Sequence, residues 1–200
     1  AHSMFQYKQS DIPIYWNYAL QFGLGDKFFS SFPTSSTPNH MTMVAAQSGG
    51  IFETVSPVGC GTAANNLIHS RDISTARDYW SYPCYNIQSL PDRLTSAGLS
   101  WRYYSNVPIW NAPGLIPSIS NSPNIVKNIS QFTSEVQNGN LANVSWITPS
   151  ADYTDHPPAL MEPAQNFVAD QVNAIMNSQY WNNTAIFLTW DDWGGFYDHM

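Results

Sequence analysis

The sequence is poor in charge, and above all in positive charge. Only 10% of its 200 residues are charged, and 7 Lys and Arg stand against 14 Asp and Glu, giving a net charge of −7. No run of basic residues is present, so the electrostatic footprint of a nucleic-acid-binding protein is missing and we predict no nucleic-acid partner. The acidity also disfavours docking on an anionic membrane surface through charge.

Long apolar stretches and cysteines are scarce as well. No window reaches the roughly 18 apolar residues of a membrane-spanning helix, so we predict no transmembrane segment. The chain begins at Ala1 without the basic start and apolar segment of a signal peptide. Its two cysteines, Cys60 and Cys84, are compatible with one disulfide bond or with two free thiols.

Aromatic residues, by contrast, are abundant. They make up 14% of the chain and apolar residues 43%, which indicates a folded protein rather than a disordered one. Two hundred residues can bury a substantial core, so we predict a single domain over residues 1–200. Low lysine, the cysteine pair and glycosylation sequons at Asn128, Asn143 and Asn182 favour an exported protein, either secreted or periplasmic.

Helical and strand patterns alternate along the chain. Capping residues and glycine stops predict helices at residues 11–23 (with Asp11 as the cap), 40–50, 89–98, 124–139 and 162–181. Strands are predicted at residues 26–32, 99–105, 142–149 and 184–190. The last of these, "TAIFLTW", is a continuous apolar run typical of a strand buried on both faces. Residues 50–86, with weak periodicity, are predicted as a surface excursion, and residues 106–124 as a long loop. The alternation predicts an α/β fold with a mostly parallel sheet sandwiched by helices.

Two adjacent carboxylates, Asp191 and Asp192, follow the apolar run. In such folds ligands bind beyond the carboxyl ends of the strands. Neighbouring like charges raise one another's pKa unless a cation lies beside them, and a divalent metal ion would resolve the conflict. Gly194 and Gly195 allow a sharp turn. The alternative is a solvated Asp-Asp turn.

A second candidate segment is "SSTPNH". Pro38, Asn39 and His40 open a predicted helix, and the free amides of a helix N-terminus suit a phosphate group. The hydroxyl of Ser36 or Thr37 would face that anion, and it becomes a nucleophile when a base or a metal lowers its pKa. The alternative is plain N-capping, the common role of Ser and Thr at this place.

The third segment is "ADYTDHPPA". Its Asp152 and His156 have the spacing to share one cation. Alternatively, Asp155 could orient His156 as an acid or a phosphate-binding group. The remaining alternative is a loop stiffened by Pro157 and Pro158 that carries a surface histidine.

Together these motifs resemble the phosphoesterase family, which holds bacterial phospholipases C and related acid phosphatases within the alkaline-phosphatase-like superfamily. The likeness covers essentially the whole chain, from "DIPIYWNYALQFGLGDKFFSSFPTSSTPNH" through "YPCYNIQSLPDRLTSAGLSWRYYS" and "VSWITPSADYTDHPPA" to "TAIFLTWDDWGGFYDHM". It implies an alkaline-phosphatase-like α/β fold. Relatives carry a metal-binding acidic residue and Asn in an earlier strand and continue past the last segment, so we expect this chain to be an interior fragment, incomplete at both ends.

Carried over by position, the resemblance implies a nucleophile and a phosphate site. Ser36, two residues before Pro-Asn, matches the family nucleophile and would also contact the metal ion. Thr37 lies at the variable position between them. Thr37, Asn39 and His40 would border the phosphate group of the substrate.

The resemblance also implies metal ligands and an acid–base group. Asp191 and Asp192 resemble the superfamily's metal-binding pair, and Asp152 resembles a ligand of a second metal. His156 would act on protons or contact phosphate. His199, in "YDHM", is a weaker candidate.

The function implied is that of a metal-dependent hydrolase that cleaves phosphate esters, phospholipids among them, through a phosphoseryl intermediate. The metal identity stays open. One alternative is a non-catalytic surface domain that binds calcium through Asp191 and Asp192. Another is a sulfatase-like hydrolase, but that class usually has Cys/Ser-x-Pro-x-Arg, and here His40 stands in place of the Arg.

Overall fold

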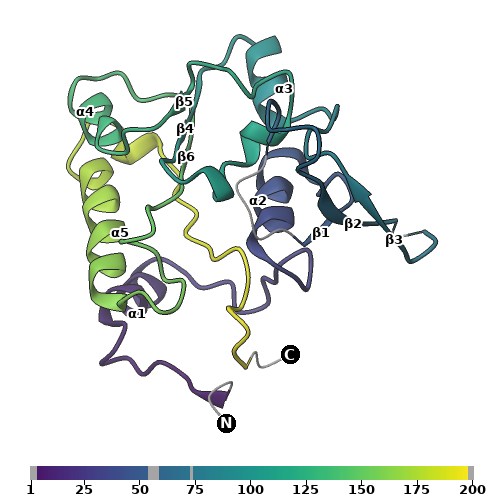
Figure 1. Ribbon diagram of the computed structural model, residues 1–200. Coiled ribbons are helices and arrows are strands. Elements are labelled where there is room, and N and C mark those ends of the chain that lie inside the picture. The colour runs from purple at the N-terminus through teal and green to yellow at the C-terminus, as the bar shows by residue number, and fades with distance from the viewer. Residues whose placement is uncertain (1–3, 54–58, 73, 198–200) are drawn as a thin grey trace. The chain divides into compact units, whose positions relative to one another are not determined.

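The computed structural model describes residues 4–53, 59–72 and 74–197, and the chain divides into two compact units (Figure 1). The first unit contains the described residues up to Ser30, Ser130–Leu141 and those from Pro149 on; the second contains Ser31–Ile129 and Ala142–Thr148. Helices and a parallel sheet are both present, so the predicted mixed α/β class is confirmed. A single catalytic domain over residues 1–200 stays a prediction.

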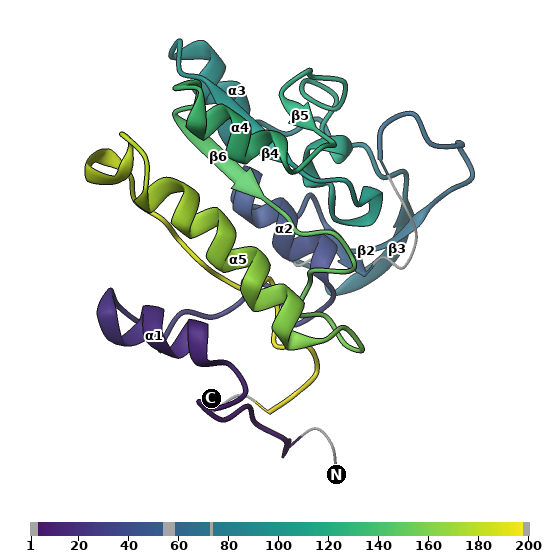
Figure 2. The same cartoon turned by 90° about the vertical axis from the view of Figure 1, so that its left-hand side faces the viewer.

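Helices build the first unit. α1 (Pro13–Gln21) and α4 (Gln131–Gln137) both contact the long α5 (Met161–Met176), as Figure 2 shows for α1, and the short 3-10 helix η4 (Trp181–Asn183) follows. Among the described residues, no helix combines the length and apolar character needed to cross a bilayer.

The start of α1 is capped from another helix. The predicted Asp11 cap is wrong, because the N-cap residue is Ile12 and no side chain there makes a capping bond. Instead the buried Gln165 of α5 accepts a hydrogen bond from the Ile14 amide at 3.2 Å and donates one to the Asp11 carbonyl at 3.0 Å. The Gln165 side chain therefore satisfies the Ile14 amide, one of the donors that a helix start leaves without an intrahelical partner, and also binds the chain just before the helix.

The second unit contains a three-stranded parallel sheet. Its order is β5 (Ile125–Val126), β4 (Trp101–Tyr104), β6 (Val144–Ile147), and both pairings are parallel. The strands predicted at residues 99–105 and 142–149 are thus confirmed. The predicted helix at residues 124–139 is confirmed only in its second half, as α4, because β5 occupies the start of that range.

Helices of the second unit pack with this sheet to form the core. They are α2 (Ser36–Ala45), α3 (Leu90–Ser96) and the 3-10 helices η2 (Pro108–Trp110) and η3 (Ala112–Leu115). The core side chains are Met41, Val44, Ile51, Ile68, Leu94, Trp101, Tyr103, Ala112, Leu115, Ile116 and Ile119. Ser89 caps α3, and its side chain forms a capping box with Asp92.

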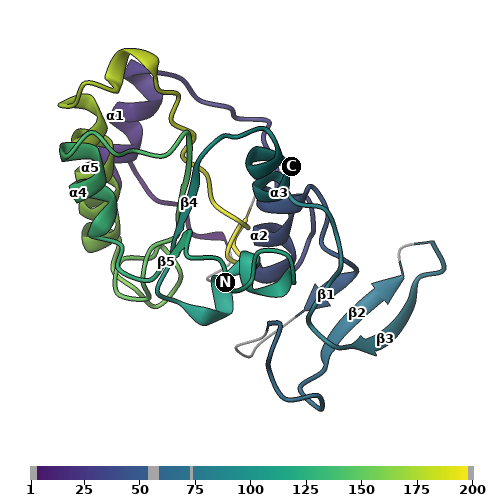
Figure 3. The ribbon, with the colours of Figure 1, turned by 90° about the horizontal axis from the view of Figure 1, so that it is seen from above.

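An antiparallel sheet occupies much of the region predicted as a surface excursion. It joins β1 (Ile51–Glu53), β2 (Ile68–Asp72) and β3 (Arg77–Ser81), and Figure 3 shows β2 and β3 as a projecting hairpin. The sequence does not predict this sheet. β3 is exposed along nearly its whole length, so it lacks the alternation of apolar and polar residues that marks a half-buried strand.

Two predicted strands are absent. Residues 26–32 contain a turn, an irregular stretch and a bend, and residues 184–190 run without strand pairing. In the latter run Phe187 is 90% exposed, and Ile186 and Leu188 are also exposed. The prediction of a strand buried on both faces is therefore wrong, because strand propensity produces a strand only where neighbouring strands supply hydrogen bonds and burial.

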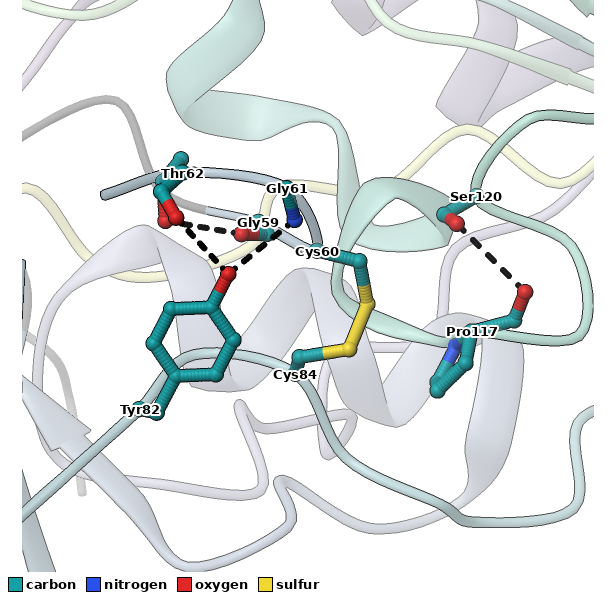
Figure 4. The surroundings of a disulfide bond; sticks show 8 residues. All are labelled: Gly59, Cys60, Gly61, Thr62, Tyr82, Cys84, Pro117 and Ser120. Atoms are coloured by element: carbon teal, nitrogen blue, oxygen red, sulfur yellow. Dashed lines mark hydrogen bonds between the residues drawn. A yellow bond between two sulfur atoms is a disulfide. The ribbon is translucent and has the colours of Figure 1, made fainter. Parts of the chain in front are cut away.

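A disulfide bond joins Cys60 to Cys84 (Figure 4), which decides between the two states the sequence left open. The Cys60 amide also donates to the Gly114 carbonyl at 2.7 Å. Beside the bridge, the Tyr82 hydroxyl accepts from the Gly61 amide at 3.1 Å and donates to the Thr62 carbonyl at 2.9 Å. The bridge thus fastens the end of the irregular segment around residue 60 to the chain that follows β3.

We predict that replacing both cysteines by serine lowers the free energy of unfolding by about 3 kcal/mol, because the open chain regains the entropy of a loop of this size. The two residues are separated by 24 positions. Urea unfolding of both proteins, with and without reductant, measures the difference. Reductant should destabilise only the wild type, and equal stabilities would contradict the bridge.

Candidate functional site

The segment around Ser36 forms the first turn of α2. The helix begins at Ser36, earlier than the predicted start at residues 38–40. Pro38 is accommodated because the first amides of a helix have no intrahelical acceptor to lose. The N-cap is Ser35, whose side chain makes no capping hydrogen bond. N-capping therefore does not explain the hydroxyl of Ser36, which already lies inside the helix.

The two candidate hydroxyls differ in burial. Thr37 is only 2% exposed, whereas Ser36 is half-buried and His40 likewise. The amides of Ser36 and Thr37 belong to the turn that lacks intrahelical acceptors, and Pro38 contributes none. Of the two hydroxyls, that of Ser36 is therefore the one more open to a ligand approaching this turn.

Asn39 holds the loop that leads into α2. Its side-chain oxygen accepts from the Phe32 amide at 3.0 Å, and its amide nitrogen lies within hydrogen-bonding distance of the carbonyls of Phe32 (3.1 Å), Ser35 (3.3 Å) and Thr34 (3.5 Å). The residue is 4% exposed. This side chain thus fixes the path of the chain immediately before Ser36, while its predicted contact with phosphate stays a prediction.

The segment after β6 carries the candidate histidine. Asp152 and His156 are both exposed. The Nδ1 atom of His156 lies 2.6 Å from the Pro157 carbonyl oxygen, which can only accept, so Nδ1 carries the proton and Nε2 is the nitrogen left to exchange one. Tyr153 stacks on Phe167 of α5 with ring centroids 5.6 Å apart, and this contact secures the segment to the helix.

Asp155 is held by two aromatic side chains, and its predicted role in orienting His156 stays a prediction. Its carboxylate accepts hydrogen bonds from the Tyr15 hydroxyl, at 3.0 Å for the nearer oxygen, and from the Trp190 indole at 2.7 Å. Burial, and then the Asp155 charge, raises the pKa of the Tyr15 phenol far above its ordinary value, so the hydroxyl remains a donor.

Asp191 and Asp192 are half-buried neighbours. Asp192 accepts from the Gly194 amide at 2.6 Å, and Gly194 and Gly195 have φ values of 65° and 76° that suit glycine. Two carboxylates supply hard oxygen ligands that fit a divalent cation. No group of three or more His, Cys, Asp or Glu side chains suited to a metal occurs in the described part of the chain, so such an ion needs hydroxyl, carbonyl or water ligands as well. His199 lies outside the described residues.

The predicted site residues fall into two sets. Ser36, Thr37, Asn39 and His40 lie together on α2 in the second unit. The other set, in the first unit, comprises Asp152, His156, Asp191 and Asp192. Convergence of the two sets on one centre stays a prediction.

Sequence reasoning missed Tyr15 and Trp190. They lie 140 and 35 positions from Asp155, and nothing in the sequence pattern links them to it.

Comparison with known proteins agrees with the motifs. The model of the phosphoesterase family matches residues 1–200. Phospholipase C B of Mycobacterium tuberculosis is 24% identical over 97% of this chain and 38% of its own length. Non-specific phospholipase C1 of Arabidopsis thaliana is 28% identical over 97% of the chain and 34% of its length, and the non-hemolytic phospholipase C of Pseudomonas aeruginosa is 25% identical over 99% and 29%. The chain spans about a third of the length of these relatives.

The bonds of Asn39 predict a stability effect. Asn39→Ala should lower the free energy of unfolding by about 1–3 kcal/mol, because buried backbone groups lose their partner. Asn39→Asp should cost a similar amount, because it turns a carboxylate oxygen toward the carbonyls of Phe32, Thr34 and Ser35. Chemical denaturation measures both variants. Wild-type stability in Asn39→Asp would show that the side chain is not needed by the loop.

Proposed function

Because the chain belongs to the phosphoesterase family, we propose that the protein hydrolyses phosphate esters, with Ser36 as the nucleophile. The family match over residues 1–200 carries this proposal. Its site-level support is the half-buried Ser36 on the first turn of α2, where a phosphoryl group can meet backbone amides. The relatives named above are phospholipases C, which supports phospholipids as the substrate class.

In the first step, the Ser36 oxygen attacks phosphorus as its proton departs. The Oγ–P bond forms, the ester P–O bond breaks, and the alcohol leaves with a proton. The amides of the first turn of α2 stabilise the negative charge on the phosphoryl oxygens. Water then attacks phosphorus, the Oγ–P bond breaks, and the phosphate product leaves Ser36 ready for another turnover.

His156 is the proposed proton carrier. Since its Nδ1 proton is held by the Pro157 carbonyl, Nε2 can take the proton that leaves Ser36 and give it to the departing alcohol. It can then take a proton from the attacking water and return it to the Ser36 oxygen as the Oγ–P bond breaks. Exposure of the ring is compatible with this exchange.

Asp191 and Asp192 would hold a divalent cation, with the Ser36 hydroxyl as a further ligand, and Asp152 would bind a second ion. When bound, such an ion lowers the pKa of a hydroxyl and stabilises phosphoryl charge. The adjacent, half-buried carboxylates support this assignment, because a cation offsets their mutual repulsion.

An extracytoplasmic location belongs to the same proposal. The Cys60–Cys84 disulfide supports it, because such bonds persist mainly in oxidising compartments.

Removing the nucleophile tests the mechanism in the full-length protein. Ser36→Ala should lower kcat on a phosphate ester at least ~10³-fold, the scale of losing a catalytic nucleophile. Ser36→Thr keeps a hydroxyl and should retain part of the rate. The matched control is Thr37→Val, which removes the neighbouring hydroxyl at similar side-chain size. If Thr37→Val is the inactive variant and Ser36→Ala is not, the assignment is wrong by one residue.

Metal analysis tests the acidic pair. Asp191→Asn should lower both the bound divalent metal, measured by elemental analysis after dialysis, and the rate of phosphate release. The control is Asp26→Asn, which removes the same charge from an exposed loop. Full metal content in Asp191→Asn would remove this carboxylate from the metal site. Metal binding by a wild type that releases no phosphate would instead favour the calcium-binding surface domain.

A further inference from the structure

Three side chains from distant parts of the first unit meet at one carboxylate, and we call Tyr15, Asp155 and Trp190 the Asp155 cluster. The Tyr15 hydroxyl from α1 donates to Asp155 at 3.0 Å, and the Trp190 indole N–H donates to the same carboxylate oxygen at 2.7 Å. The two rings also touch edge to face, with centroids 5.1 Å apart. Each pair of the cluster is therefore in contact.

The chemistry of the cluster suits a fixed connection. An indole N–H can only donate, and an ionised carboxylate can only accept. Tyr15 is 7% exposed, and burial together with Asp155 raises its pKa, so its hydroxyl stays protonated and available as a donor. Hydrogen bonds to an ionised carboxylate are stronger than those between neutral groups, so both donors hold Asp155 in place.

The position of the cluster in the sequence connects it to the proposed site. Asp155 immediately precedes His156, and Trp190 immediately precedes Asp191. The bond between Asp155 and Trp190 thus joins the segment that carries the proton carrier to the segment that carries a metal ligand. Tyr15 ties both segments to α1.

The segment before Asp191 is held in place by the side chain of Trp190. Residues 184–190 lack strand pairing, and Phe187 points into solvent at 90% exposure. No β-ladder therefore fixes Trp190 or the acidic pair behind it. The contacts of the Trp190 side chain with Asp155 and Tyr15 hold this part of the chain instead.

We propose that Asp155 is a positioning residue, which through Trp190 and Tyr15 holds the backbone of His156 and that of Asp191 in a fixed relation. It touches neither substrate nor metal in this scheme. This inference rests on the proposed function, because His156 and Asp191 need fixed positions only if they take part in that reaction. Small displacements of catalytic groups lower rates strongly, so loss of the bond should show in turnover.

The test is Trp190→Phe in the full-length protein, which keeps an aromatic ring against Tyr15 and removes only the N–H donor. We expect kcat to fall about 10- to 100-fold with KM nearly unchanged, and the affinity for the divalent metal ion, measured by equilibrium dialysis, to fall on a similar scale. The same substitution at Trp181, which packs on Phe22 in the same unit, is the control and should leave all three quantities at wild-type values.

A double-mutant cycle separates positioning from general stability. If the cluster acts as one connection, Asp155→Ala combined with Trp190→Phe is no slower than Asp155→Ala alone. Asp155→Asn keeps an oxygen that can accept from Trp190, so its kcat should lie between those of the wild type and Asp155→Ala. Rates are compared per folded molecule, at a temperature below the thermal midpoint of every variant.

The outcomes separate the two proposals. If Ser36→Ala abolishes turnover while Trp190→Phe keeps wild-type kcat and metal affinity, the positioning role is overturned and the proposed function stands. A lowered thermal midpoint with unchanged kcat in Trp190→Phe would mean a structural role alone, which also overturns it. If the wild type hydrolyses no phosphate ester, both proposals fall.

Discussion

Hydrogen bonding of buried polar side chains is the constraint on which both units depend. A polar group taken out of water costs free energy unless it finds a partner, so a buried side chain bonded to a distant residue connects two parts of the chain. Asn39 connects α2 to the loop before it, Gln165 connects α5 to the start of α1, and Asp155 accepts from the buried Tyr15. These bonds set where the chemistry-bearing residues lie more directly than the apolar core does.

Phosphoryl transfer places particular demands on such connections. The reaction offers little covalent chemistry to a protein beyond its nucleophile, so positioning and charge stabilisation supply most of the rate. A nucleophile on the first turn of a helix has its backbone fixed by that helix, and Asn39 fixes the approach to it. Loops carry the other candidate groups, and for them stacking of Tyr153 on Phe167 and the bonds of Asp155 take the place of regular structure.

Local signals predicted the elements that are governed by local physics. The cap of α3 at Ser89, the long helix α5 and the strands β4 and β6 are predicted from the sequence, because each depends on residues a few positions apart. The hairpin of β2 and β3 is not predicted because the exposed strand β3 carries little alternation. The predicted start of α2 is too late, because the first turn of a helix tolerates proline at its third position and not only where the helix opens.

In the candidate site, too, local motifs are predicted from the sequence and contacts between distant residues are not. Motifs identified Ser36, His156 and the acidic pair as candidates, since their chemistry can be read from residue type and spacing. The hydrogen bonds that hold the segments of these residues cannot be predicted from the sequence, because Tyr15 and Trp190 lie 140 and 35 positions from Asp155. The apolar run before Asp191 makes the difference plain: its composition is that of a buried strand, yet without paired neighbours it lies exposed. The indole hydrogen bond and the ring contact of Trp190 help to hold the chain just before the acidic pair, and neither of these has a signature in the sequence.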